Sequence, residues 1–385
     1  MGVFLLIFFG ILFVSGTPSR ADDPVTVVQY PLINRPALVL PGESLSIECE
    51  VSSSVSGWKV TLSGPYKDVI PSVSPGEYVS GVRKLTAVVP QDAPYELYDL
   101  RVQSSGGIDD VVRNCVRILP EYKDTFTFVH LPDCHLPAVA WIGFYDDPNS
   151  VSEFEQITKE LNIIHPEFIL QTGDLVDNGR QEDQFRLAQE LLEEFEVPVF
   201  ITGGNHDLWH GHANWHRYFG KTMDYSFRYG ATRLLGLEMY DTPSKTYTAE
   251  QMKWLRTELD GSIVAGEESR IIFTHYDESQ QLTGEFLDQY LIDGIFYGHT
   301  HINADRGVNG DADTHTVGDA NRNTHADADG YTDADRHTDS DADRDSHSNA
   351  KRDADADADR DGGTHPQRRA GQGNPARAGH GRFGQ

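Results

Sequence analysis

Apolar runs of strand length alternate with segments of helical periodicity between residues 123 and 303. Five such runs lead directly into groups of polar residues: Phe126–Val129, Phe168–Gln171, Val197–Thr202, Ile271–Thr274 and Gly294–Tyr297. Between them, apolar side chains recur at three- and four-residue steps, as in amphipathic helices, at Val151, Phe154, Ile157, Leu161 and Ile164, and again at Phe185, Ala188, Leu192 and Phe195. This alternation of strand and helix predicts a layered α/β core.

A third helix in the same segment has a clear start signal. Thr248 stands shortly before the apolar positions Met252 and Leu255, and Gln251 lies three residues after Thr248. A threonine and a glutamine at this spacing can each bond the other's backbone N–H, which forms a capping box. We therefore expect a helix to begin directly after Thr248.

Residues 22–122 carry a different pattern, in which short runs of alternating apolar and polar residues are broken by Gly, Pro and Ser. The clearest runs are Leu45–Val51, Lys59–Leu62 and Tyr98–Val102. Period-two alternation with regular breaks predicts a small all-β sandwich domain. Residues 44–49 resemble the second strand of an immunoglobulin-like domain. We expect this domain to be a spacer or packing partner for the α/β part rather than a ligand binder.

Two cysteines of this sandwich leave a question open. Cys49 and Cys115 can form a disulfide in an oxidising compartment. They can equally remain free thiols, because sequence spacing does not fix the geometry that a disulfide needs.

The first 21 residues are typical of a signal peptide. Val3–Val14 is almost wholly apolar, and small and polar residues follow as far as Ala21. The run is shorter than the roughly 20 apolar residues that span a bilayer. We therefore expect a secreted or extracytoplasmic, cell-surface protein. The alternative is an uncleaved N-terminal anchor, because no Lys or Arg precedes the apolar run.

Residues 304–385 form a low-complexity, Asp-rich segment without Glu, Leu, Ile or Trp. Such a segment cannot bury enough apolar surface to fold alone, so we expect a disordered tail. Calcium sites are a second interpretation, since residues 357–362 match the start of an EF-hand loop. However, Arg368 stands where that loop needs a bidentate Glu, and we do not expect the tail to bind calcium. A third interpretation is a shifted reading frame, because the monotonous composition begins directly after Asn303.

Polar motifs follow the apolar runs of the α/β segment. In chain order they are Asp133-Cys134-His135, Gly173-Asp174-Leu175-Val176-Asp177, Gly204-Asn205-His206-Asp207, Thr274-His275 and Gly298-His299-Thr300-His301. One motif alone is weak, since a Gly-Asn-His-Asp sequence is also a common turn. Together they supply the oxygen and imidazole ligands that divalent cations prefer. Because each motif ends a predicted strand, the sheet should gather them at one edge.

This ordered set resembles the calcineurin-like metallophosphoesterase superfamily, whose pattern is D-x-H, G-D-x-x-D, G-N-H-D/E, a lone His and G-H-x-H. Over residues 123–303 the resemblance implies an α/β (α+β) metallophosphoesterase sandwich, with two mixed β-sheets flanked by helices. It also implies two divalent metal ions, drawn from Mn, Fe or Zn. The ligands implied for the first ion are Asp133, His135, Asp174 and His301. Asp174 would bridge to the second ion, whose further ligands would be Asn205, His275 and His299.

The resemblance also implies catalytic roles for two residues that bind no metal. His206 would contact the phosphate and protonate or stabilise the leaving oxygen, and Asp177 would hold the His206 imidazole in orientation. Purple acid phosphatases share the scaffold but place a tyrosine ligand three residues after the bridging aspartate, at the position of Asp177 here. We therefore expect no tyrosinate-iron centre. We also expect Cys134 to pack away from the metals, although a thiol can bind a soft metal.

Two segments near the motifs are candidates for shaping a substrate pocket. Trp141–Asp147 follows the first motif, and Trp209–His216 follows the Asn-His motif and contains two tryptophans and three histidines. The second segment could equally be an ordinary surface helix with aromatic packing.

The charge balance narrows the choice of partner. The chain has 60 acidic and 32 basic residues, which argues against a nucleic-acid docking surface. It does not exclude a small phosphoester, because bound metals would dominate the local charge. The sequence therefore predicts a metallophosphoesterase that hydrolyses a phosphomonoester or phosphodiester with a dinuclear metal centre and a bridging hydroxide. The alternative is a catalytically inactive surface or adhesion protein that retains the scaffold.

Overall fold

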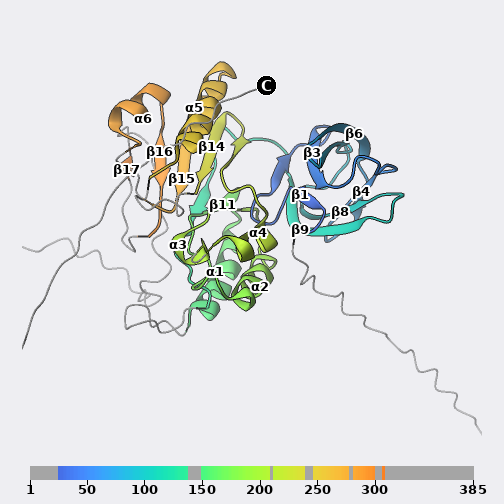
Figure 1. The fold of residues 1–385 in the computed structure, drawn as a ribbon, viewed down its shortest axis with the longest axis horizontal. Helices are drawn as coiled ribbons and strands as arrows, with labels where there is room; N and C mark the ends of the chain where they lie inside the picture. Colours follow the sequence, from blue (N-terminus) through green and yellow to red (C-terminus); the bar gives the residue numbers. More distant parts are fainter. Residues whose placement is uncertain are drawn as a thin grey trace, which may run out of the picture. The chain divides into compact units, whose positions relative to one another are not determined.

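The computed structural model describes residues 25–137, 149–208, 211–238, 246–276, 281–299 and 306–307. All of them lie in one compact unit within residues 1–327 (Figure 1). The predicted signal peptide, the candidate loop Trp141–Asp147 and the predicted metal ligand His301 lie outside the described residues, as do Trp209 and His210. Of the predicted tail, residues 304–385, only residues 306–307 are described. Within the described residues, no helix is long and apolar enough to cross a membrane.

The N-terminal part is an all-β sandwich of two sheets. One sheet is antiparallel, with the order β1 (Val28–Tyr30), β3 (Ser44–Glu50), β7 (Val82–Val88) and β6 (Ser72–Val79). The other has the order β2 (Ala37–Val39), β9 (Asp109–Ile118), β8 (Leu97–Gln103), β4 (Lys59–Ser63) and β5 (Asp68–Val69). Leu45, Ile47 and Cys49 of β3 are buried and alternate with exposed or half-buried neighbours, as the period-two pattern predicted.

The two cysteines of this sandwich are free thiols in the structure, and so is Cys134. Cys49 and Cys115 are both fully buried in the sandwich core. Burial raises the pKa of the Cys49 thiol to about 12 and that of Cys115 well above its ordinary value. Both thiols are therefore protonated and inert near neutral pH.

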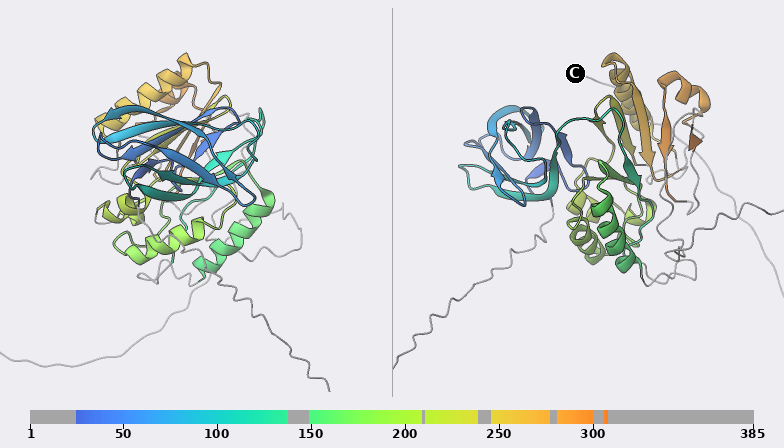
Figure 2. Two further views of the ribbon diagram at one scale, coloured as in Figure 1. Left: turned by 90° about the vertical axis from the view of Figure 1, so that its right-hand side faces the viewer. Right: turned by 180° about the vertical axis from the view of Figure 1, so that it is seen from behind.

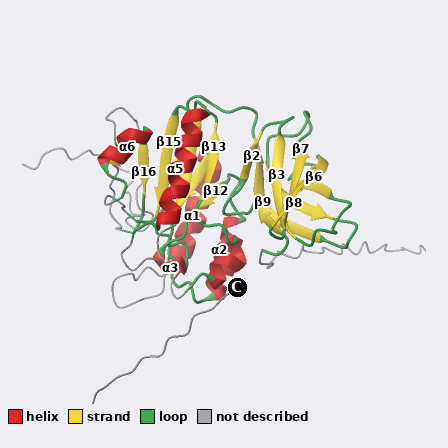
Figure 3. Cartoon of the chain, turned by 45° about the horizontal axis from the view of Figure 1, so that its top comes forward, coloured by secondary structure: helices red, strands yellow, loops and turns green. Residues whose placement is uncertain are grey.

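Two further sheets build the α/β part. Three parallel strands form the first: β10 (Phe128–His130), β11 (Phe168–Gln171) and β12 (Val199–Ile201). The second sheet is mixed and has the order β13 (Tyr225–Tyr229), β14 (Thr232–Leu237), β15 (Ser269–Thr274), β16 (Gly294–Phe296) and β17 (Arg306–Gly307). All five predicted strands are present, and the predicted two-sheet architecture flanked by helices is confirmed (Figure 3).

The helices cover the outer faces of these sheets. α1 (Ser150–Ile164) and α2 (Glu182–Leu192) pack on the three-stranded sheet, with α3 (Asn205–Leu208) and α4 (Ala213–Phe219) following β12. α5 (Ala249–Val264) and α6 (Gly284–Tyr290) cover the mixed sheet. In Figure 2 the green helices α1 and α2 and the gold helix α5 lie at opposite ends of this part. Aromatic side chains fill the space between the two sheets, where Phe168 and Phe200 face Phe227 and Phe273.

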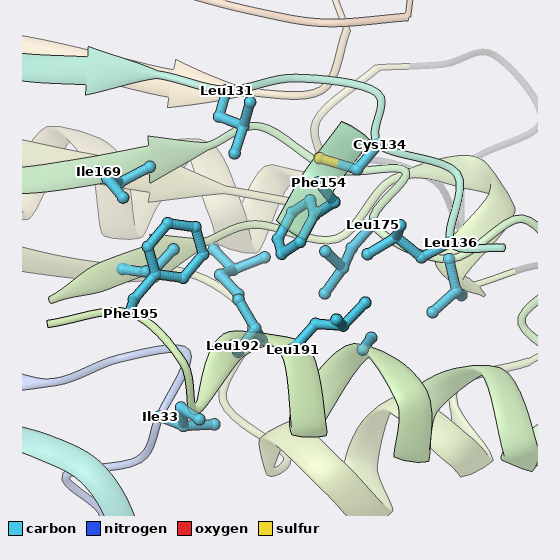
Figure 4. Close-up of a cluster of buried hydrophobic side chains, with 14 of the residues drawn as sticks. Ile33, Leu131, Cys134, Leu136, Phe154, Ile169, Leu175, Leu191, Leu192 and Phe195 are labelled. Carbon is cyan, nitrogen blue, oxygen red and sulfur yellow. The ribbon is translucent and has the colours of Figure 1, made fainter. Parts of the chain in front are cut away.

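The core beneath the three-stranded sheet fixes the strand ends that carry the motifs. Phe154 of α1, Leu191 and Leu192 of α2 and Ile169 of β11 belong to one buried hydrophobic cluster (Figure 4). Cys134 is 4 % exposed and belongs to this core. Its thiol is therefore used in packing, as the sequence analysis favoured.

The β-sandwich contributes to this same core through residues 31–36. Ile33 lies in the cluster around α2. The Asn34 carbonyl accepts a 2.9 Å hydrogen bond from the amide of Ile201. On the same face, the Asn114 side chain donates to the carbonyls of Glu193 and Phe195 at 2.8 and 3.0 Å. The sandwich thus covers the free edge of β12, the strand that leads into Asn205.

Helix α5 begins where the sequence predicted. The Thr248 side chain accepts from the Gln251 amide at 3.1 Å, and the Gln251 side chain accepts from the Thr248 amide at 3.0 Å. The Gln251 side chain also donates to Asp224 at 3.1 Å, which ties the helix start to the loop before β13.

We predict that Thr248→Ala lowers the free energy of unfolding by about 1 kcal/mol, because the Gln251 amide at the helix start loses the Thr248 hydroxyl as its partner. Urea unfolding followed by circular dichroism measures the change. Thr257→Ala in the exposed middle of α5 is the matched control, because Thr257 bonds only a carbonyl of its own helix. Equal losses in the two variants would contradict the capping role.

Candidate metal centre

Five strand ends bring the predicted motifs together. Asp133 follows β10, Asp174 follows β11, Asn205 follows β12, His275 follows β15 and His299 follows β16. Ligand atoms of Asp133, His135 and Asp174 lie within 4.8 Å of one another, and so do those of Asp174, His275 and His299. Oδ1 of Asn205 lies 3.0 Å from Nε2 of His275. Six of the seven predicted metal ligands therefore meet in one place, and the seventh, His301, lies outside the described residues.

Asp174 stands between the two groups of ligands. Its Oδ1 accepts a 2.8 Å hydrogen bond from the His206 amide, and its Oδ2 lies 3.2 Å from Nε2 of His275 and 3.8 Å from Nε2 of His135. Burial alone would raise the pKa of Asp174, but His275, His135 and His206 more than offset this and hold it well below its ordinary value. Asp174 is therefore an ionised carboxylate at the centre of the site.

The His275 ring shows that the site requires a positive charge. Its Nδ1 lies 2.9 Å from the Thr172 carbonyl, which can only accept, so Nδ1 carries a proton. In the neutral ring, Nε2 then presents a lone pair to Oδ1 of Asn205 at 3.0 Å and to Oδ2 of Asp174 at 3.2 Å. Three acceptor atoms that face one another in a buried site need a cation between them. The cation can be a proton or a metal ion.

The electrostatics of the protein without metal agree with this conclusion. Burial alone would lower the pKa of His275, but Asp174 and Asp133 raise it to about 9. Burial raises the pKa of Asp133 to about 7, with His275 opposing the shift and Asp174 adding to it. In the protein without metal, protons therefore occupy positions where these side chains could bind divalent ions. The residues present fit a dinuclear metal centre.

Backbone strain is concentrated at the same residues. Asp133, His135, Asp174 and His299 all have left-handed backbone conformations, with φ of 52°, 47°, 51° and 68°. Such conformations are costly for residues other than glycine and are characteristic of functional sites. Two neighbouring loops also approach too closely for any side chain. A Cβ on Gly204 would lie 2.3 Å from the Asp174 amide nitrogen, and one on Gly298 would lie 2.6 Å from Oδ2 of Asp133.

Comparison with known proteins decides the family. Residues 126–303 match the model of the calcineurin-like phosphoesterase family. This part of the chain is a calcineurin-like phosphoesterase domain. A search among curated proteins found no match.

Solved structures with a similar arrangement are distant in sequence. The purple acid phosphatase PPD1 from yellow lupin (Lupinus luteus) seeds is 12 % identical with a TM-score of 0.42, and the alignment covers 72 % of this chain and 58 % of the lupin chain. A dimetal phosphatase from Danio rerio is 15 % identical with a TM-score of 0.32, covering 39 % of this chain and 69 % of the other. The present chain thus spans little more than half the length of the lupin protein.

The phosphoesterase domain holds His206 differently from the sequence expectation. Its Nδ1 bonds the backbone carbonyl of Asp177 at 2.7 Å, whereas the Asp177 carboxylate is 4.0 Å away. That carboxylate lies nearer to Nδ1 of His135, at 3.7 Å. Asp177 therefore orients His206 through its main chain and directs its charge towards His135. The Asp177 carbonyl thus takes the place expected for the Asp177 carboxylate. It still defines the His206 tautomer, because a carbonyl accepts a hydrogen bond only from a protonated Nδ1.

Two residues of the phosphoesterase site were not singled out by the sequence analysis. Asp207 is fully buried and accepts from the amides of Val176 and Gly204 at 2.8 and 2.9 Å. It thereby joins the loop after β11 to the loop after β12. Tyr276, directly after the lone histidine, donates to Oδ1 of Asn205 at 2.9 Å. Asp207 does stand in the family motif, but nothing around Tyr276 in the sequence indicates its position.

The candidate pocket segment Trp209–His216 is described only from residue 211. Trp215 is 1 % exposed and packs at 5.0 Å, ring to ring, on Phe219. Tyr218 and Phe219 of the same helix are also buried. The described part of this segment is therefore a packed helix, which favours the second of the two interpretations above.

We predict that Asp207→Asn lowers the free energy of unfolding by about 2 kcal/mol, because the new amide group turns a donor towards one of two buried backbone donors. Chemical unfolding in the presence of EDTA measures this without a metal contribution. Asp260→Asn on the exposed face of α5 is the control and should change stability by less than about 0.5 kcal/mol. Stability unchanged by Asp207→Asn would show that the two loops do not depend on the carboxylate.

Divalent ions should stabilise the fold. An ion at 100 times its dissociation constant adds about 2.7 kcal/mol for each site. Differential scanning calorimetry of the full chain should therefore give a higher melting temperature with Mn²⁺ than with EDTA. Asp174→Asn should remove this difference. A melting temperature that is the same with Mn²⁺ and with EDTA would rule out the centre.

Proposed function

We propose that this protein is a secreted or cell-surface enzyme that hydrolyses small phosphoesters with a dinuclear metal centre. The observation that carries the proposal is the convergence of Asp174, Asn205 and the lone pair of His275 on one point, which a divalent cation satisfies. Membership of the calcineurin-like phosphoesterases supports the reaction class. The first ion would be held by Asp133, His135 and Asp174, with His301, and the second by Asp174, Asn205, His275 and His299.

When bound, two such ions would supply a bridging hydroxide as nucleophile and neutralise charge on the phosphoryl oxygens. The chain's own residues would do the rest. Asp174 joins the two halves of the site, because its Oδ2 lies 3.2 Å from Nε2 of His275 and 3.8 Å from Nε2 of His135. The His299 amide, 2.9 and 3.1 Å from the two oxygens of Asp133, keeps that carboxylate turned towards the site.

His206 is suited to serve the leaving group. Its Nδ1 is committed to the Asp177 carbonyl, so Nε2 is the nitrogen whose protonation can change. Its side chain is 12 % exposed and its ring meets that of His135 edge-on at 4.5 Å, so it lies at the border between the ligands and solvent. As an oxygen derived from water would form its bond to phosphorus and the bond from phosphorus to the ester oxygen would break, Nε2 of His206 would give its proton to the departing oxygen.

The charge of the chain favours a small phosphoester over a polyanionic substrate. With 60 acidic and 32 basic residues, the chain offers little attraction to a polyanion such as a nucleic acid. The apolar N-terminal run supports export, so substrates outside the cytoplasm are proposed. We do not assign calcium binding to the tail.

The test is hydrolysis of p-nitrophenyl phosphate and bis(p-nitrophenyl) phosphate by the purified chain with Mn²⁺. We expect turnover of at least one substrate, and no measurable turnover by Asp174→Ala. We expect His206→Gln to lower kcat by about 10²- to 10⁴-fold, the usual contribution of a general acid.

His165→Asn is the control for these variants. His165 is exposed at the end of α1 with a φ of 54°, a conformation that asparagine tolerates. This variant should keep wild-type activity. Wild-type protein that binds two metal ions yet hydrolyses neither substrate would overturn the assignment of these substrate classes. Protein that binds no metal would support the inactive scaffold instead.

A further inference from the structure

One side chain contacts three of the residues expected to hold the second ion. The Tyr276 hydroxyl donates to Oδ1 of Asn205 at 2.9 Å. The Tyr276 ring lies 4.4 Å from the His299 ring and 5.0 Å from the His275 ring, measured between centroids. Tyr276 is 6 % exposed.

The hydroxyl acts on the orientation of the Asn205 amide. An asparagine binds a cation through its oxygen, and its NH₂ group is nearly the same size, so the two ends can exchange places. A ligand imidazole must be neutral at the nitrogen that binds metal. In that state Nε2 of His275 has no proton to give to Oδ1 of Asn205, although it lies 3.0 Å away. The Tyr276 hydroxyl is then the neighbouring group that donates to this oxygen.

The ring acts on the two imidazoles. Tyr276 belongs to the buried cluster that joins β14 and β15 to α5 and α6. Tyr276 lies two residues after the end of β15, and its ring is packed in a cluster formed by this sheet and two helices. His299 has a left-handed backbone and stands on a loop. Contact with a ring anchored in the core limits the rotation of the His299 imidazole.

We infer that Tyr276 is a positioning residue for the second metal site, where it orients the Asn205 oxygen with its hydroxyl and supports His299 with its ring. The inference rests on the proposed function and adds a residue to it. The two roles of the side chain can be tested separately, because replacement of Tyr276 by phenylalanine removes the hydroxyl and keeps the ring.

Tyr247 provides a matched control. It is 4 % exposed and lies in the same buried cluster. Its hydroxyl donates to Oγ1 of Thr274 at 3.2 Å, one residue before His275. Tyr247→Phe therefore removes a buried, hydrogen-bonded hydroxyl from the same region without removing a contact to Asn205.

The experiment is titration of the metal-free full chain with Mn²⁺, followed by calorimetry and by electron paramagnetic resonance. We expect wild type and Tyr247→Phe to bind two ions and to show the spectrum of a coupled Mn²⁺ pair. We expect Tyr276→Phe to bind one ion normally and the other at least 10-fold more weakly, the usual effect of losing a group that orients a ligand. At two equivalents its spectrum should retain isolated Mn²⁺. Equal affinities in Tyr276→Phe and Tyr247→Phe would overturn the inference.

A second variant tests the orientation argument itself. In Asn205→Asp both ends of the side chain are oxygens, so no exchange of oxygen for NH₂ can occur. The 10-fold effect of Tyr276→Phe should therefore shrink towards onefold in the Asn205→Asp background, and an undiminished effect would overturn the role of the hydroxyl. Failure of the wild type to bind two Mn²⁺ ions would contradict the proposed function itself, whereas the comparisons between variants bear only on Tyr276.

Discussion

The buried carboxylate of Asp174 is the constraint on which the rest of the site depends. It is ionised at 1 % exposure, which a protein tolerates only when charges or donors surround the group. The His206 amide, His275 and His135 provide that surrounding. Their approach in turn requires loops so close together that Gly204 can carry no side chain. The buried charge of Asp174 therefore explains why position 204 is a glycine and why His275 and His135 converge on the carboxylate. It also explains the left-handed backbone at Asp174 itself.

Much of this arrangement could be predicted from the sequence, because it depends on local order. Apolar runs end where the polar motifs begin, and parallel strands place such ends at one edge. The predicted strands, the capping box of α5 and the meeting of six predicted ligands depend on such local order. The carboxylate of Asp177 and the ring of Tyr276 could not be placed in the same way. Whether Asp177 faces His206 or His135 depends on side-chain rotation in a folded loop, and the contact between Tyr276 and Asn205 joins positions 71 residues apart.

The β-sandwich is more than an attached module. A spacer would meet the phosphoesterase domain through polar surface alone, whereas Ile33 enters its core and Asn34 bonds the edge of β12. Unpaired edge strands expose amides that must otherwise be hydrated or find another chain. By pairing with Ile201, the sandwich satisfies an amide four residues before Asn205. The packing expected from the sequence thus occurs at the strand that leads to His206 and Asn205, the proposed catalytic histidine and a proposed metal ligand.

The two halves of the centre are held by different means. Asp133 is fixed largely by the main chain, through the His299 amide and its own left-handed conformation. Asn205 depends on side chains, with Tyr276 and His275 both bonded to one oxygen. Main-chain contacts change little while the fold is intact, but an amide group can rotate without unfolding anything. We therefore expect the second half to be the more adjustable, with a metal occupancy that depends on residues outside the ligand set, where family motifs give no guidance.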